Sequence, residues 1–172
     1  MKRTFLGMCL SLILIGCRYK PTTYYAKSVL GERIYAEVTI SRKDPQNTVL
    51  IKDSVNEAIV SRFGGKIASK DSAETFLHVS IGSISFSPTV YDEYGYVIAY
   101  KTTVYLNIRY QKREGKVHHL RTSGEYDFSI EANSVISDSK RFDAIRFASN
   151  DALDEFISKI AIKGLYNGNN NQ

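Results

Sequence analysis

Apolar residues recur along the chain at two different spacings, which together predict a mixture of strands and helices. Alternating apolar positions predict strands at 34–40, 77–86, 96–110 and 117–130, with a further short strand near 66–68. Across Gly82 and Ser83 the alternation slips by one residue, which predicts a β-bulge inside one long strand.

Two segments repeat their apolar residues at helical spacing. The first follows Asp44, a good N-cap, has Pro45 at its first position, and ends at Gly64-Gly65. The second begins near 138–139 and ends at Gly164. The resulting order is β-α-β-β-β-β-α. Because both helices must bury their apolar stripes on the sheet, the predicted fold is α+β, a two-layer α/β sandwich. It has an approximately four-stranded mixed or antiparallel sheet with two helices packed on one face, and its other face is exposed or covered by a partner.

The first 16 residues have the layout of a secretory signal peptide. Lys2 and Arg3 precede an apolar run at 5–15, which is too short to cross a bilayer because a spanning helix needs about 20 residues. The run ends in Gly16-Cys17, which resembles the lipobox of bacterial lipoproteins. Cys17 is therefore predicted to carry lipid, with cleavage just before it.

This interpretation divides the chain into a signal peptide (1–16), a lipidated N-terminal tether (17–32), a single α/β domain (33–166) and a disordered tail (167–172). The sequence has two cysteines. Cys9 leaves with the signal peptide and Cys17 is acylated, so the domain is predicted to fold without a disulfide.

Net charge adds a mild basic bias, +5 for the whole sequence and +3 once Lys2 and Arg3 are removed. That charge suits anionic lipid or phosphate, but it is not the footprint of a nucleic-acid-binding protein. Arg18 follows Cys17, where an aspartate retains many bacterial lipoproteins in the inner membrane. The resemblance therefore implies a lipid-anchored position on the periplasmic side of the outer membrane.

Motifs for catalysis do not emerge from the sequence. Gly64-Gly65-Lys66 lacks the rest of a phosphate-binding loop, and no G-x-S-x-G elbow is present. His118 and His119 are adjacent on a strand and point to opposite faces, although His78 could meet one of them. We therefore predict no enzyme activity, no metal site and no cofactor.

Aromatic and basic side chains crowd the two central hairpins. Tyrosine suits partner contacts, since it combines apolar area with a polar tip. Lysine and arginine suit phosphate-bearing ligands. Both sets also have a plain structural interpretation. The tyrosines are good strand formers, and the basic residues can simply form a solvated hairpin. The candidate partner contacts are Tyr91, Tyr94, Tyr96, Tyr100 and Tyr105, and the candidate ligand contacts are Lys101, Arg109, Lys112, Arg113, Lys116 and Arg121.

The order of these elements resembles the LptE family, the lipopolysaccharide-assembly lipoproteins of Gram-negative outer membranes. The resemblance lies in the lipobox, the helix around 53–59 leading to Gly64-Gly65, the strands at 77–84 and 99–106, and the last amphipathic helix. It implies a protein that plugs and helps to assemble the LptD outer-membrane β-barrel and contacts lipopolysaccharide on its way to the surface.

One departure from the family concerns the tip of the first long hairpin. Family members often carry basic residues there, whereas residues 92–95 read Asp-Glu-Tyr-Gly. Lipid phosphates are therefore better matched by Lys101 or by the basic turn from Arg109 to Arg121. Two other functions stay open, a stand-alone structural or ligand-binding envelope lipoprotein that touches peptidoglycan, and a periplasmic hydrolase.

Overall fold

The computed structural model describes residues 22–39 and 45–169. The predicted signal peptide, Cys17 and Asp44 lie outside these ranges. None of the helices in the described part is long and apolar enough to cross a membrane. In chain order the elements are α2 (Thr22–Leu30), β1 (Arg33–Val38), α3 (Pro45–Ser61), β2 (Lys66–Ile67), β3 (Thr75–Tyr91), β4 (Val97–Lys112), β5 (Val117–Ser129) and α4 (Asp138–Asn169).

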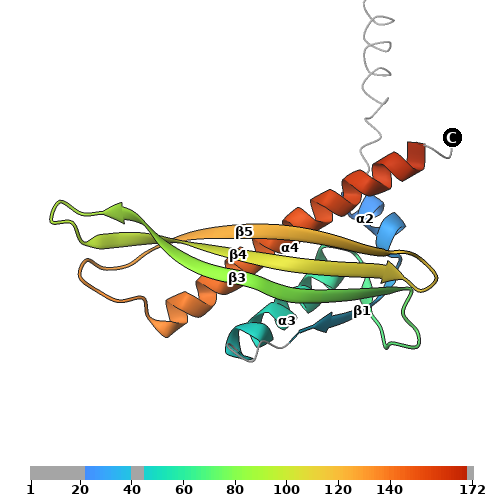
Figure 1. Ribbon diagram of the computed structural model, residues 1–172, viewed down its shortest axis with the longest axis horizontal. Coiled ribbons are helices and arrows are strands. Elements are labelled where there is room, and N and C mark those ends of the chain that lie inside the picture. Colours follow the sequence, from blue (N-terminus) through green and yellow to red (C-terminus); the bar gives the residue numbers. More distant parts are fainter. Residues whose placement is uncertain (1–21, 40–44, 170–172) are drawn as a thin grey trace, which may run out of the picture.

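The strands form one mixed sheet in the order β2-β1-β3-β4-β5. β1 runs parallel to both of its neighbours, whereas β3, β4 and β5 are antiparallel. This confirms the predicted α+β fold, with a fifth strand because residues 66–67 pair with residues 33–34. In Figure 1 the long β3–β4 hairpin forms one end of the molecule.

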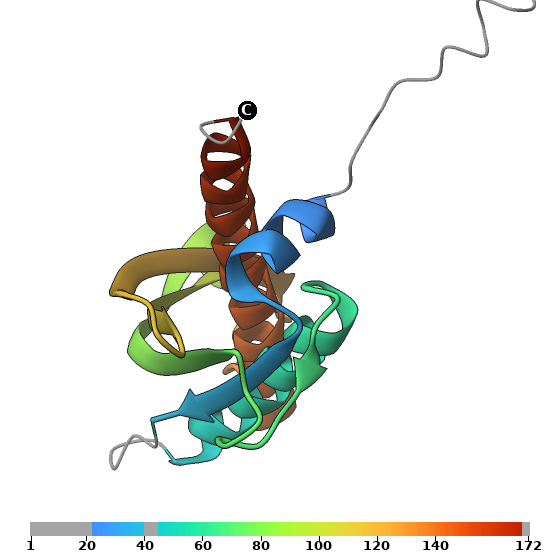
Figure 2. The ribbon, with the colours of Figure 1, turned by 90° about the vertical axis from the view of Figure 1, so that its right-hand side faces the viewer.

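All three helices cover the same face of the sheet (Figure 2). Alternate strand residues point into this layer, and the side chains between them point away from it. The core therefore takes Leu77 and Val79 from β3 and Val104, Leu106 and Ile108 from β4, all nearly inaccessible to solvent. The helices contribute a second set, which includes Ile51, Val55 and Ile59 of α3 and Ile145, Leu153, Phe156 and Ile160 of α4.

The predicted bulge in β3 is confirmed. The pairing of β3 with β4 shifts between Ile81 and Ser83, so that one extra residue is accommodated there. The extra residue keeps Ile81 and Ile84 on the helix side, although they are three residues apart. The end of α3 also follows the prediction, because Gly64 has a φ of 63° and the amide of Gly65 bonds to the carbonyl of Ile59 at 2.9 Å.

The segment 17–32 was expected to be a tether, but residues 22–30 form α2 and pack on α4. Ala26 and Leu30 are buried in the core, so this short helix supplies part of the domain's own apolar surface. The prediction failed because the packing of α2 on α4 is a contact between segments far apart in the chain, which the local pattern at 17–32 does not show.

Gly164 was expected to end the last helix, but α4 continues to Asn169 and includes the first residues of the predicted tail. The glycine serves helix packing instead. A side chain at Gly164 would lie 2.5 Å from the carbonyl oxygen of Tyr25 on α2. Gly124 on β5 has the same role, because a Cβ there would overlap the backbone of α4 at Ala148 and Ala152. These two glycines let α4 pack against both the sheet and α2.

Candidate functional site

The face of the sheet turned away from the helices carries a row of polar side chains that crosses four strands. Glu37 of β1 pairs with His78 of β3, His78 pairs with Arg109 of β4, and Arg109 pairs with His119 of β5. Side chains that are directly opposite on one face of a sheet lie about 4.5–5.5 Å apart at Cβ. The register therefore gathers three nitrogen-rich side chains on one surface.

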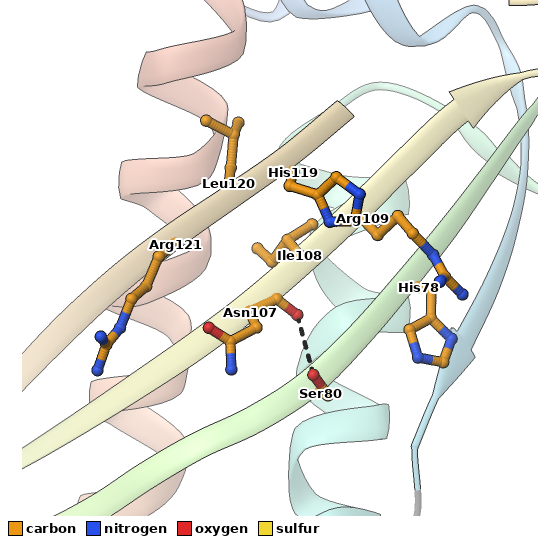
Figure 3. A pocket seen from close by; sticks show the side chains of 8 residues that line it. All are labelled: His78, Ser80, Asn107, Ile108, Arg109, His119, Leu120 and Arg121. Atoms are coloured by element: carbon orange, nitrogen blue, oxygen red, sulfur yellow. Dashed lines mark hydrogen bonds between the residues drawn. The ribbon is translucent and has the colours of Figure 1, made fainter. Parts of the chain in front are cut away.

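A second row lies one pair further along the same strands. Ser80 pairs with Asn107, and Asn107 pairs with Arg121. The hydroxyl of Ser80 donates to the backbone carbonyl of Asn107 at 3.4 Å (Figure 3). The two rows line an open hollow of about 480 Å³. Figure 3 shows Arg109, Arg121 and His119 around it, on β4 and β5.

The basic side chains that line this hollow form few contacts within the described part of the chain. Arg109 and His119 form no ion pair or side-chain hydrogen bond there. Arg121 lies over the ring of Tyr105, with its guanidinium carbon 4.6 Å from the ring centroid. Arg109 can therefore turn toward an anion without breaking an ion pair or a hydrogen bond, whereas Arg121 would give up its contact with the Tyr105 ring.

His78 sits at the acidic edge of the hollow. Its Nε2 lies 2.7 Å from the hydroxyl oxygen of Thr39, a hydrogen bond whose direction depends on the tautomer. Its Nδ1 is buried without a hydrogen-bond partner and lies 3.6 Å from a carboxylate oxygen of Glu37. His78 therefore lies between the Glu37 carboxylate and the hollow.

The six predicted basic residues fall into two groups in the structure. Arg109 and Arg121 line the hollow, and Lys101 lies further along the same face. Lys101 bonds to Glu125 at 2.7 Å. This hydrogen bond, together with the negative charges of Glu125 and Asp127, raises the pKa of the Lys101 ammonium group.

Lys112, Arg113 and Lys116 lie at the β4–β5 turn, away from that hollow. Arg113 donates to the backbone carbonyls of Ala73 at 3.0 Å and Lys70 at 3.1 Å, and so holds the loop before β3. Lys112 donates to the carbonyl of Ser28 at 3.3 Å. The structure thus gives Arg113 a structural task that its sequence position did not reveal.

The predicted tyrosine set is divided among three places. Tyr91, Tyr94 and Tyr96 are exposed at the tip of the β3–β4 hairpin. The turn is fixed by Asp92, whose carboxylate accepts from the amides of Tyr94 at 3.0 Å and Tyr96 at 2.8 Å. Tyr105 lies on the open face, whereas Tyr100 stacks on Phe128 on the helix side, at 6.1 Å between ring centroids. Only the three tip residues form one surface.

The sequence pattern did not predict that His78, His119 or Asn107 would line a ligand site. Alternation alone puts Asn107 and Arg109 on one face of their strand. However, the partners of that face depend on the register between strands, which one sequence does not fix. The structure places His119 on the open face and His118 on the helix side. Within the described residues no three His, Cys, Asp or Glu side chains are grouped to hold a metal ion.

Comparison with solved structures places the architecture in a class of small two-layer α+β proteins. Rare lipoprotein B from Shewanella oneidensis is 12% identical with a TM-score of 0.51, and the match covers 78% of this chain and 98% of that one. A protein from Xanthomonas campestris is 13% identical with a TM-score of 0.51, over 80% and 87% of the two chains. At such low identity these likenesses establish the fold alone.

The particular family follows from the sequence. The family model LptE, described as lipopolysaccharide-assembly, matches residues 35–160. No match was found among curated proteins. The chain therefore belongs to the LptE lipopolysaccharide-assembly family, as its element order predicted. This membership supports a role in lipopolysaccharide assembly, in a family of lipoproteins that are not enzymes.

Proposed function

We propose that this protein is a lipid-anchored outer-membrane component that plugs and helps to assemble an LptD-like β-barrel and contacts lipopolysaccharide during its delivery. Cys17 would carry the anchor on the periplasmic side. The observation that carries the proposal is the open sheet face, where Arg109 and Arg121 stand without carboxylate partners in the described chain. A plug needs an open surface for contact with its barrel and its ligand. The sheet face opposite the helices is such a surface.

The chemistry of the hollow suits a phosphorylated saccharide. Guanidinium groups bind phosphate oxygens in pairs, so Arg109 and Arg121 would take the charged groups. Asn107 and Ser80 offer amide and hydroxyl groups that suit sugar hydroxyls. Lys101 lies further from the hollow and is bound to Glu125, so it would be a secondary contact. The tip tyrosines, which are large and exposed, would contact the barrel.

The ligand half of the proposal is tested by replacing both arginines. Arg109→Ser with Arg121→Ser should weaken binding of purified lipopolysaccharide by roughly tenfold or more at low salt, because two charge-assisted contacts are lost. The matched control is Lys52→Ser with Arg146→Ser, which removes the same charge from exposed positions on α3 and α4. Equal binding by the two double variants at low salt would eliminate the hollow as the ligand site.

The proposed interaction with a β-barrel is tested on protein purified with its lipid anchor. Lipidated protein from gently solubilised outer membranes should bring a β-barrel protein with it, and mass spectrometry identifies that partner. Recovery as a lone monomer would contradict the plug. Retention on cell-wall material, without a barrel, would favour the stand-alone peptidoglycan-binding alternative.

A further inference from the structure

The end of the molecule where α2 begins and α4 finishes carries an apolar stripe. Ile162, Leu165 and Tyr166 are 54%, 43% and 70% exposed. They are spaced i, i+3 and i+4, so they share one face of the last turns of α4. Tyr24 on α2 is 53% exposed at the same end. Both ribbon views place the start of α2 beside this part of α4 (Figures 1 and 2).

The fold cannot bury this stripe by turning the helix. Ala161 and Gly164, on the other side of the same turns, are already buried. Gly164 lies so close to α2 that a Cβ would be 2.5 Å from the carbonyl oxygen of Tyr25. A rotation of α4 that buried Ile162 and Tyr166 would bring larger side chains into that contact. The stripe therefore stays on the surface of the isolated chain.

The two segments that form this end are basic. Residues 18–31 and 156–172 contain no Asp or Glu and carry three and two basic residues respectively, of which Lys27 pairs with Glu32 and Lys159 with Glu155 just outside the segments. Basic residues near a bilayer are attracted to anionic headgroups. Tyrosine is enriched at the boundary between headgroups and acyl chains. The composition of this end therefore fits the surface of a lipid bilayer.

The number of residues between Cys17 and α2 limits how far this end of the molecule can lie from the lipid anchor. Five residue steps separate Cys17 from Thr22, which at about 3.6 Å per residue span at most about 18 Å. This step rests on the proposed function, in which Cys17 carries lipid. Acyl chains on Cys17 would hold the start of α2 within that distance of the leaflet, and the end of α4 lies beside α2.

We infer that this end is a membrane-docking surface, on which Ile162, Leu165 and Tyr166 enter the headgroup layer of the leaflet that holds the lipid anchor. The anchor alone attaches the protein to the leaflet but does not set its orientation. The docked stripe fixes its orientation. The β3–β4 tip forms the other end of the molecule (Figure 1) and is held away from that leaflet.

The test measures the depth of a spin label on lipidated protein in vesicles of phosphatidylethanolamine and phosphatidylglycerol. Tyr166→Cys carries the nitroxide, and Val135→Cys, 89% exposed before the start of α4, is the control. Oxygen concentrates in the bilayer, whereas a neutral nickel complex stays in water. The label at 166 should collide with nickel several-fold less often than the label at 135, and more often with oxygen.

A second pair of variants separates docking from simple proximity. Ile162→Ser with Leu165→Ser should return the label at 166 to water, whereas Val60→Ser, at an exposed position on α3, should leave it shielded. Equal nickel accessibility at 166 and 135, on protein whose intact mass shows lipid on Cys17, overturns docking and leaves the anchor standing. An unmodified Cys17 overturns the anchor and the reach argument together. Lipopolysaccharide binding, measured separately, reports on the rest of the proposed function.

Discussion

The two faces of the sheet are built from the same strands and differ in almost every property. On β4, Ile108 and Tyr110 point into the helix layer and are buried, whereas Arg109 between them points into the open hollow. A slip of one residue in register would exchange the two sets. The pairing of strands therefore fixes the dry core and the candidate binding surface in a single step.

The two faces separate the contacts that stabilise the fold from the surface proposed to bind a ligand. The helix side is held by close contacts that tolerate little change, such as Phe156 against Phe63 at 5.6 Å and Tyr110 at 6.0 Å between ring centroids. The open side holds polar groups that pack on few neighbours. Substitutions on the first face should act on the free energy of unfolding, and substitutions on the second should act on binding.

The largest effect is expected from matched truncations on the two faces. Phe156→Ala removes a fully buried ring and should lower the free energy of unfolding by about 3–5 kcal/mol. Phe76→Ala, on the open face beside Tyr35 and Arg113, should cost about 1 kcal/mol. Urea denaturation of the two variants measures both values. Similar losses would show that the open face is part of the core.

A smaller loss is expected from adding one methyl group where α4 crosses β5. Gly124→Ala should cost about 1–3 kcal/mol, because its Cβ would overlap backbone atoms of Ala148 and Ala152, which cannot move independently of the helix. Ser123→Ala, at the preceding residue on the open face, should change the free energy of unfolding by less than about 0.5 kcal/mol. Thermal unfolding of both variants gives the comparison. A neutral Gly124→Ala would mean that α4 can lift from the sheet without cost.

Much of the fold was predictable from local patterns. The bulge at Gly82-Ser83, the end of α3 just before Gly64 and the start of α4 at Asp138 each follow from alternation or capping within a few residues. The order of strands was not predictable in this way, because the insertion of β1 between β2 and β3 depends on contacts between distant segments. The packing of α2 and the role of Gly164 were missed for the same reason, because both depend on the contact between α2 and α4.

The candidate site was predictable in part. Arg109 and Arg121 were expected to bind a ligand on the strength of basic enrichment, and that role stays a prediction. Their grouping with His78 and Asn107 requires the register of three strands. Arg113 has the same composition signal as Arg109, yet its guanidinium holds the loop carbonyls of Ala73 and Lys70. Residue type indicated a chemistry, but only the pairing of the strands separates an arginine on the open face from one that holds a loop.

The smallest effect concerns pH and the two adjacent histidines, which lie on opposite faces. His118 stacks on Tyr110 at 5.0 Å, and its Nδ1 lies 3.0 Å from the ammonium nitrogen of Lys163. Burial, together with the positive charges of Lys163 and Lys116, lowers the pKa of His118. A lysine ammonium can only donate, so this contact requires His118 to be neutral at Nδ1.

Because the pKa of His118 is lower in the folded protein, the unfolded chain binds a proton first as the pH falls. The free energy of unfolding should therefore decrease as the pH drops below the ordinary histidine pKa of about 6.5, until the folded protein is protonated as well. His118→Gln keeps an acceptor for Lys163 without titrating, and should flatten this dependence between neutral pH and mild acid. His119→Gln, on the open face without a bonded lysine, should leave the dependence in place. Urea denaturation of both variants across this range gives the measurement, and equal slopes would show that the pKa of His118 does not differ between the folded and unfolded chain.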